Sequence, residues 1–282
     1  MNELRTMHLF AGIGGGLLCD LILGHRPVVA VEWEPYACQV LRERAAEGWF
    51  PGLHVWEGDV RLFDPSEYAG KVDCIHAGFP CQDISVAGKQ AGVSEGTRSG
   101  LYREVLRIAG IVRPKYLFLE NVAAILSNGL GTVLADLAAM GYDSRWCCLR
   151  ASDVGAPHLR DRWWLLADAD SDKWGSGCMG KDAESNRRND AWRMGEVVSN
   201  AECVRLSGQW KSIESFGSAP DSHWQTDWTN NCGQANIGWW DAESELGRLA
   251  YGIPNRVGQL KGYGNAQVPM QAAVAWKLLG GQ

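Results

Sequence analysis

Residues 6–16 read TMHLFAGIGGG, in which a strand candidate at 6–10 runs into a turn with four glycines and then into a helical pattern from Gly15. Glycines between a strand and a helix let a ligand approach the backbone at the helix N-terminus. A tight turn without a ligand is the competing interpretation of the glycines alone.

The alternation of strand and helix patterns continues as far as Ala167. Further strand candidates are 27–33, 55–60, 72–79, 116–121, 144–150 and 163–167, and helix candidates are 15–23, 35–47, 99–111 and 130–140. Residues 116–119 read YLFL, an apolar run typical of a strand buried on both faces. We therefore predict an α/β fold built on a mostly parallel sheet.

The character of the sequence changes twice after this region. Residues 168–247 are rich in Asp, Ser, Asn and Gly, show little periodicity and hold seven of the fourteen tryptophans. Order returns at Arg248, where GNAQVP at 264–269 leads into a helical stretch at 270–279. We expect a first domain at 1–167, a smaller irregular region at 168–247, and a final segment at 248–282 that packs back on the first domain.

Composition excludes several classes of protein. No apolar run in the 282 residues is long enough to cross a bilayer, and the N-terminus lacks a signal-peptide pattern, so we expect a cytoplasmic protein. The nine cysteines contain no Cys-x-x-Cys pair, which favours reduced thiols and offers no readable zinc or other metal site. The net charge is −6, and residues 168–247 carry seven basic and fourteen acidic side chains. Net charge therefore gives no support for nucleic-acid binding, which has to be argued from the site itself.

Two acidic residues follow the glycine-rich turn at informative distances. Glu32 ends the second strand candidate, twenty residues beyond Gly12, where a carboxylate can bind ribose hydroxyls. Asp59 ends the third strand candidate and can reach an adenine amino group. The pair favours an adenosine-containing cofactor, although the glycine spacing is not that of NAD-binding dehydrogenases.

A cysteine, a carboxylate and two arginines follow later strands. Cys81 comes directly after Pro80 at the end of the fourth strand candidate, and Glu120 follows the apolar fifth. Carboxyl ends of adjacent strands share one crevice, so a thiol nucleophile and a carboxylate with a raised pKa would meet there. Arg160 and Arg162 alternate along the chain and face the same way. Each of these features alone also has an ordinary structural interpretation. The cysteine could be a packed thiol, the glutamate a paired carboxylate, and the two arginines part of a solvated edge.

Five ordered motifs together resemble the cytosine-5 DNA methyltransferase family. They are FAGIGG at 10–15, GFPCQ at 78–82, ENV at 120–122, RDR at 160–162, and GNA with VP within 264–269. The resemblance covers the chain except roughly 168–247. His8 departs from the pattern, because an acidic residue commonly precedes the Leu-Phe pair there.

The resemblance implies a Rossmann-like, S-adenosylmethionine-dependent methyltransferase domain at 1–167 with a target-recognition region at 168–247. The residues implied to bind S-adenosylmethionine are Phe10, Gly12, Ile13, Gly15, Glu32, Trp33, Asp59, Val60, Pro80, Leu101, Asn265 and Ala266. Cys81 is implied as the nucleophile that attacks cytosine, with Glu120, Arg160 and Arg162 as the other catalytic residues. Gln82, Ser85 and Arg98 lie on the following loop and are implied to contact double-stranded DNA around a flipped cytosine.

Alternatives remain open at this point. A relative that methylates cytosine in tRNA would keep the same chemistry, and the long insert at 168–247 favours DNA over it. A non-catalytic DNA-binding relative is the second alternative, against which stands the presence of Cys81, Glu120, Arg160 and Arg162. We expect a monomer without a metal or membrane contact, and we leave a cognate restriction endonuclease open as a partner.

Overall fold

The computed structural model describes residues 3–80, 100–169, 202–203, 262 and 264–281. In these residues strands and helices alternate from the N-terminus onward. They are β1 (Arg5–Leu9), α1 (Gly15–Leu23), β2 (Arg26–Glu32), α2 (Pro35–Ala46), β3 (His54–Glu57), β4 (Cys74–Gly78), α3 (Leu101–Val112), β5 (Tyr116–Val122), α4 (Ile125–Asn128), α5 (Leu130–Ala139), β6 (Tyr142–Arg150), β7 (Asp161–Ala169), β8 (Glu202–Cys203) and α9 (Pro269–Leu278).

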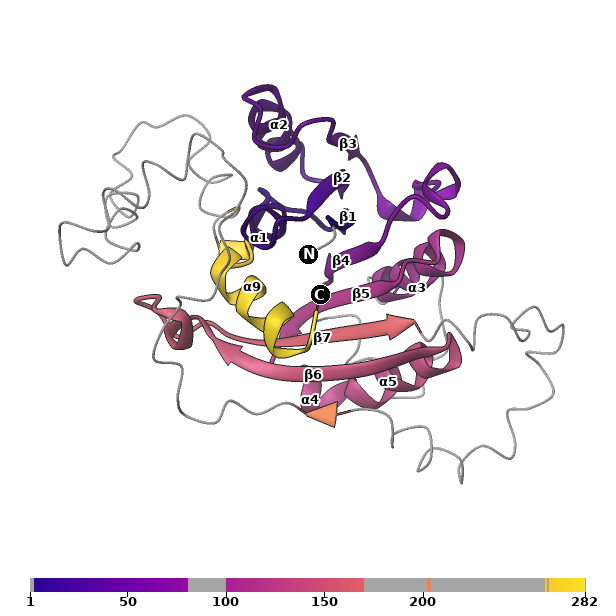
Figure 1. Ribbon diagram of the computed structural model, residues 1–282, viewed down its shortest axis with the longest axis vertical. Helices are drawn as coiled ribbons and strands as arrows, with labels where there is room; N and C mark the ends of the chain where they lie inside the picture. The colour runs from indigo at the N-terminus through magenta and orange to yellow at the C-terminus, as the bar shows by residue number, and fades with distance from the viewer. Residues whose placement is uncertain (1–2, 81–99, 170–201, 204–261, 263, 282) are drawn as a thin grey trace, which may run out of the picture.

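The strands form one sheet in the order β3-β2-β1-β4-β5-β7-β6-β8 (Figure 1). β1 to β5 pair in parallel, whereas β7 runs antiparallel to both of its neighbours. The order reverses direction on either side of β1 and β4, so the carboxyl ends of these two strands flank the switch point where open α/β sheets bind ligands. The predicted mostly parallel, Rossmann-like α/β fold is confirmed.

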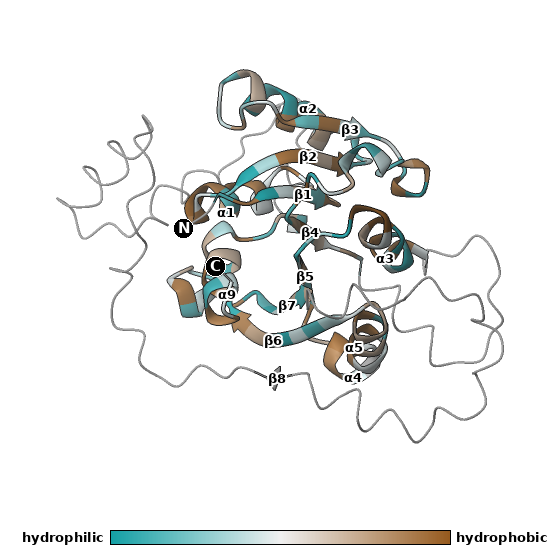
Figure 2. Cartoon of the chain, turned by 45° about the vertical axis from the view of Figure 1, so that its right-hand side comes forward, coloured by the Kyte–Doolittle hydropathy of each residue, from teal (hydrophilic) through white to brown (hydrophobic). Residues whose placement is uncertain are grey.

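Helices cover both faces of the sheet, with α1 and α9 on one side and α3, α4 and α5 on the other (Figure 2). Alternation along the strands decides which side chain faces which layer. In β5, Leu117 and Leu119 join the core under α3 and α5, while Tyr116 and Phe118 join the core under α1 and α9. The strands are therefore apolar at consecutive positions because both faces are buried.

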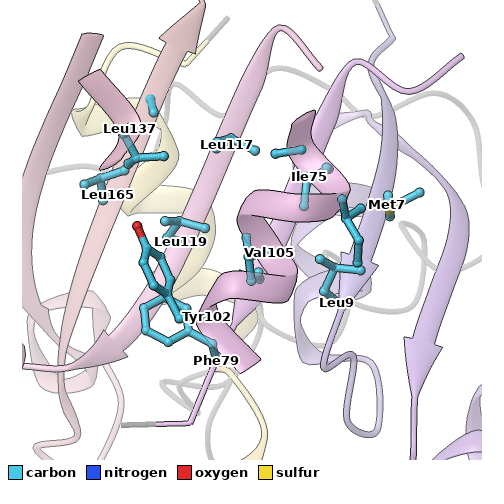
Figure 3. Packing of buried hydrophobic residues seen from close by; sticks show 14 of the residues in the cluster. Met7, Leu9, Ile75, Phe79, Tyr102, Val105, Leu117, Leu119, Leu137 and Leu165 are labelled. Atoms are coloured by element: carbon cyan, nitrogen blue, oxygen red, sulfur yellow. The ribbon is translucent and has the colours of Figure 1, made fainter. Parts of the chain in front are cut away.

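The larger core lies under α3 and α5. Val105 of α3 reaches the middle strands, while Leu137 of α5 packs toward β5 and β7 (Figure 3). Phe79, just beyond β4, contacts Tyr102 of α3 with ring centroids 5.2 Å apart. This contact anchors the chain one residue before Pro80.

The last helix returns to the first domain, as expected from its sequence. α9 packs against α1, and its Trp276 is buried beside Tyr116 and Phe118. The helix expected at 270–279 thus forms at Pro269–Leu278. The division of the chain at Ala167 and Arg248 remains a prediction. None of the helices among the described residues is both long and apolar enough to span a membrane.

The predicted element boundaries differ from the observed ones by up to two residues, except at the end of the third strand. The third strand was expected to extend through 55–60, but β3 ends at Glu57 and a 3₁₀ turn covers Val60–Leu62. Gly58 has a φ of 157°, and Asp59 caps the turn by accepting a hydrogen bond from the backbone N–H of Arg61. The local side chain-to-backbone bond ends the strand three residues earlier than expected.

Candidate active site

The glycine-rich turn after β1 adopts backbone angles that favour glycine. Gly12 and Gly14 have φ values of 55° and 99°, and Gly14 caps the N-terminus of α1. Phe10 also has a positive φ, 58°, which is uncommon for a residue with a side chain. A Cβ added to Gly12 would meet no atom within 4 Å, so space for a ligand adjoins the turn.

Glu32 fixes this turn from the end of β2. Its Oε2 accepts a hydrogen bond from the Gly12 N–H at 2.7 Å, and its Oε1 accepts from the N–H groups of Trp33 and Glu34, both at 2.9 Å. A carboxylate oxygen has two lone pairs, so Oε2 keeps one acceptor position. Next to it, the Trp33 side chain is 70% exposed, a large apolar surface presented to solvent.

A pocket of about 350 Å³, including the space at its mouth, joins this turn to the ends of β4 and β5. Its lining residues are His8, Leu9, Phe10, Ala11, Gly12, Gly16, His76, Gly78, Glu120, Asn265, Ala266 and Gln267. The pocket therefore brings together Phe10, Gly12, Glu120, Asn265 and Ala266 of the residues predicted for the site.

Glu120 lies at the floor of the pocket. Its backbone pairs with Gly78 across β4 and β5, and its side chain is 11% exposed. Arg162 of β7 holds the carboxylate, with its Nε 2.9 Å from Oε1. Burial raises the pKa of Glu120 above its ordinary value, while the charges of Arg162 and Arg160 and a hydrogen bond from Gln267 oppose that rise. The carboxyl group can therefore exchange a proton closer to neutral pH than an exposed glutamate does.

Arg160 has a different set of contacts from Arg162. Its guanidinium donates hydrogen bonds to the carbonyl oxygens of Gly264 and Ala266, at 2.9 and 2.6 Å. Arg160 itself has a φ of 20°. It thus ties the segment before α9 to the start of β7, and this segment carries Asn265 and Ala266 to the pocket.

Gln267, the fourth residue of GNAQVP, is a functional candidate that was not predicted from the sequence. A Cβ on Gly15 would lie 2.2 Å from the Gln267 carbonyl oxygen. A Cβ on Gly16 would lie 2.8 Å from its Oε1, and one on Gly78 would lie 2.8 Å from its Nε2. Three glycines from two separate motifs therefore leave the slot that Gln267 fills. A polar residue between Ala266 and the Val-Pro pair was the available signal.

Behind Gln267 lies a buried polar cluster of Thr6, His8, Asp20, His25 and His76. Asp20 accepts hydrogen bonds from Thr6 and from His8 Nε2, the latter at 2.6 Å, and His25 Nδ1 lies 3.8 Å away. Burial alone would raise the pKa of Asp20, but the charge of His8 and hydrogen bonds from His25 and His8 lower it well below its ordinary range. Burial lowers the pKa of His76 to about 3.

The same cluster has the donor types of a cation site. Ligand atoms of His8, Asp20 and His76 lie within 4.8 Å of one another. The separation of His8 and Asp20 is that of a direct hydrogen bond, so the cluster as described is a hydrogen-bonded network. His8 is the residue that departs from the motif pattern, in which an acidic residue is common at this position. Asp20 of α1 places a carboxylate within hydrogen-bond distance of it.

The other predicted cofactor residues lie outside the pocket lining. Asp59 pairs with Arg61, whose hydrogen bonds lower the pKa of that carboxyl group. Val60 is buried in the core, Leu101 begins α3 and packs against the same core, and Pro80 is exposed beyond β4. The Ile13 side chain lies beside Gly262, where an added Cβ would be 2.9 Å from it. Gly15 lies against the backbone of Gln267.

The remaining predicted residues fall outside the part of the chain that the structure describes. These are Cys81, Gln82, Ser85, Arg98 and nearly all of 168–247. The described chain reaches Pro80, the residue before the predicted nucleophile.

Comparison with known proteins assigns the chain to a family. The family model for C-5 cytosine-specific DNA methylases matches residues 4–234. The match covers well over half of the 282 residues, so this chain belongs to the C-5 cytosine-specific DNA methylase family.

Individual relatives agree with this assignment. The type II methyltransferase M.CviJI of Paramecium bursaria Chlorella virus IL3A is 38% identical over 166 residues, which are 58% of this chain and 42% of that protein. The type II methyltransferase M.NgoMIV of Neisseria gonorrhoeae is 36% identical over 169 residues, 58% and 52% of the two chains. The matched part of this chain thus spans about half the length of these curated relatives. A crystal structure of a DNMT2 variant from Spodoptera frugiperda, 19% identical with a TM-score of 0.51 over 73% of this chain and 56% of that one, supports the fold.

Proposed function

We propose that this chain is a DNA (cytosine-5-)-methyltransferase that uses S-adenosylmethionine and attacks a flipped cytosine with Cys81. The observation that carries the proposal is the buried Glu120–Arg162 pair in the pocket, on the strand next to the one that leads into Pro80 and Cys81. Membership of the C-5 cytosine-specific DNA methylase family supports the same reaction.

The reaction needs a nucleophile because carbon 5 of cytosine is a weak one. A bond from the Cys81 sulfur to carbon 6 moves the electron pair of the 5,6 double bond toward carbon 5, which can then accept a methyl group. After methyl transfer, a base removes the proton from carbon 5 and the carbon–sulfur bond breaks. The product is 5-methylcytosine with the thiolate restored.

Glu120 supports this attack by holding a proton at ring nitrogen 3 as negative charge develops on the ring. Its raised pKa suits that role, because an ordinary carboxyl group would be ionised at neutral pH. Arg162 orients the carboxyl group and places a positive charge next to the base carbonyl. Arg160 acts mainly on the backbone of 264–266, through the two carbonyls that it binds.

The pocket fits S-adenosylmethionine, whose sulfonium supplies an electrophilic methyl group. The described residues that line the pocket include neither lysine nor arginine, and Glu120 contributes a carboxyl group to it. The remaining acceptor position on Glu32 suits a ribose hydroxyl, and the exposed Trp33 ring suits an adenine face. Asp59, Val60, Phe10, Gly12, Ile13, Gly15, Pro80, Leu101, Asn265 and Ala266 complete the proposed cofactor contacts.

Duplex DNA is the proposed substrate, because the type II methyltransferases M.CviJI and M.NgoMIV are similar to this chain. Attack on carbon 6 is impossible within a stacked duplex, so the cytosine has to be flipped out. Gln82, Ser85 and Arg98 would contact the DNA around it, and 168–247 would read the flanking bases. Action as a monomer remains a prediction, and a cognate restriction endonuclease remains open as a partner.

Expression in a host without cytosine methylation, followed by bisulfite sequencing, tests activity and target together. The wild type should leave 5-methylcytosine at one recurring sequence, and Cys81→Ser should leave none. Purified protein is then given duplex DNA and tRNA with labelled cofactor. Label in tRNA alone would favour the tRNA methyltransferase, and binding of DNA and cofactor without transfer would favour the non-catalytic relative.

A further inference from the structure

We propose that Gln267 is a positioning residue that holds Glu120 in its working orientation and is itself oriented by His76. The inference rests on the proposed function, since it concerns the residue that we expect to protonate the base. It begins from a side-chain amide in the pocket lining whose oxygen lies against Gly16 and whose nitrogen lies against Gly78.

The surroundings of Gln267 distinguish the two ends of its amide. Nε2 and Glu120 Oε2 lie near the same point, 2.8 and 3.0 Å from the Cβ position on Gly78. Oε1 lies near the Cβ position on Gly16, together with ring atoms of His8 and His76 at 3.0 Å. The amide N–H₂ therefore faces the carboxylate, and the amide oxygen faces the imidazoles.

The hydrogen bonds agree with this orientation. The Gln267 side chain bonds to Glu120, which lowers the pKa of that carboxyl group, and to His76, which raises the pKa of that ring. The Nε2 of His76 is buried without a partner, so we assign the bond with Gln267 to Nδ1. Nδ1–H donates to the amide oxygen, and the amide then donates to Glu120.

Packing and a hydrogen bond hold the two histidine rings behind the amide. His76 pairs in register with His8 across β4 and β1, and the two ring centroids are 5.0 Å apart. His8 is in turn bonded to Asp20 of α1. A reversed amide would place two donors toward His76 and an oxygen toward the Glu120 carboxylate, so one orientation is favoured.

Several charged and titratable groups surround Glu120. Arg162 faces it from β7, and Arg160 faces it from the position just before β7. Gln267 faces it from the segment before α9. Behind Gln267 lie His76 of β4, His8 of β1 and Asp20 of α1. Loss of the amide removes one donor to the carboxylate and one restraint on its position. A displacement near 1 Å in a catalytic group can cost about 100-fold in rate.

The experiment compares Gln267→Met with Gln271→Met in the purified full chain. Gln271 is a buried glutamine of α9 that donates to the backbone carbonyl oxygens of Leu149 and Arg160, so Gln271→Met removes an amide of the same kind that bonds to backbone and not to Glu120. Gln267→Met should lower kcat about 10- to 100-fold. The KM for DNA and the calorimetric Kd for S-adenosylmethionine should change less than about threefold, because the amide acts on Glu120 rather than on binding.

The pH profile gives a readout that structural damage does not move. Removing a donor raises the pKa of Glu120, so the alkaline limb of kcat should shift to higher pH in Gln267→Met and stay in place in Gln271→Met. His76→Leu should reproduce the shift. His76→Asn, which keeps an N–H near the Nδ1 position, should restore most of the wild-type rate and limb.

An active wild type with an unshifted limb and near-normal kcat in Gln267→Met overturns this inference alone. Equal behaviour of His76→Leu and His76→Asn overturns the part assigned to His76. A wild type that transfers no methyl group overturns the proposed function and this inference with it.

Discussion

Replacing Gly15 by alanine tests the contact that brings the end of the chain to the cofactor turn. The new Cβ would lie 2.2 Å from the carbonyl oxygen of Gln267 and 3.0 Å from its carbonyl carbon and its backbone nitrogen. An ordinary contact is longer by roughly 1 Å, so backbone on one side has to move. The φ of Gly15 is outside the left-handed region, so alanine brings no backbone strain of its own.

The expected cost follows from what resists that movement. The segment before α9, which contains Gln267, is held by two hydrogen bonds from Arg160 and by the packing of α9 against α1. Forcing extra volume into such a site costs about 1–3 kcal/mol, against which helical alanine recovers about 0.5–1 kcal/mol relative to glycine. We expect a net loss of about 1–2 kcal/mol and weaker binding of S-adenosylmethionine.

Urea unfolding followed by circular dichroism measures the difference, with Gly110→Ala as the matched control. Gly110 lies within α3, and a Cβ there meets nothing within 4 Å. That variant should gain about 0.5–1 kcal/mol, so the two substitutions should have opposite signs. A Gly15→Ala variant as stable as Gly110→Ala, with wild-type cofactor affinity, would refute the packing of Gln267 against α1.

Three further predictions concern single side chains. Glu120→Gln should lower kcat by roughly 10²–10⁴-fold with DNA binding retained, and near-normal turnover would count against the acid role of Glu120. Because the pKa of Glu120 is raised in the fold, the wild type should lose stability as pH rises above about 4.5, and the variant should lose less. Trp33→Ala should raise the KM for S-adenosylmethionine and leave the melting temperature unchanged, because the ring is 70% exposed; an unchanged KM removes it from the cofactor site. The pKa of His76 is about 3 in the fold and near 6.5 in the unfolded chain, so the wild type should lose up to about 5 kcal/mol of stability as pH falls between these values. In urea unfolding at a series of pH values, the free energy of unfolding of His76→Leu should fall less steeply with acid.

Local patterns were enough to predict most of the fold. The apolar run at 116–119 became β5, buried on both faces, and the glycine turn after β1 led into α1 at the expected residue. The proximity of Glu120 to the end of β4 also followed, because parallel neighbours share an edge. These features depend on short-range periodicity and on general rules of sheet topology.

The interior of the site depended on long-range packing that no local pattern contains. Gln267 reaches Gly15 and Gly78 across about 250 and 190 positions of sequence, and each residue taken alone has an ordinary interpretation. His8 and His76 look like isolated histidines in apolar strands until the β1–β4 register places them side by side. The end of the third strand was predicted wrongly, because the side-chain cap of Asp59 ends β3 before the extended sequence pattern does.

The nucleophilic role of Cys81 is tested most directly with duplex DNA that carries 5-fluorocytosine at the recognised position. Fluorine at carbon 5 cannot leave as a proton does, so the sulfur–carbon 6 bond should persist after methyl transfer. Intact mass and peptide mapping should find one protein–DNA adduct, on Cys81, formed only with S-adenosylmethionine present. An adduct on another residue, or efficient methylation of ordinary cytosine without any adduct on the fluorinated base, would contradict the mechanism.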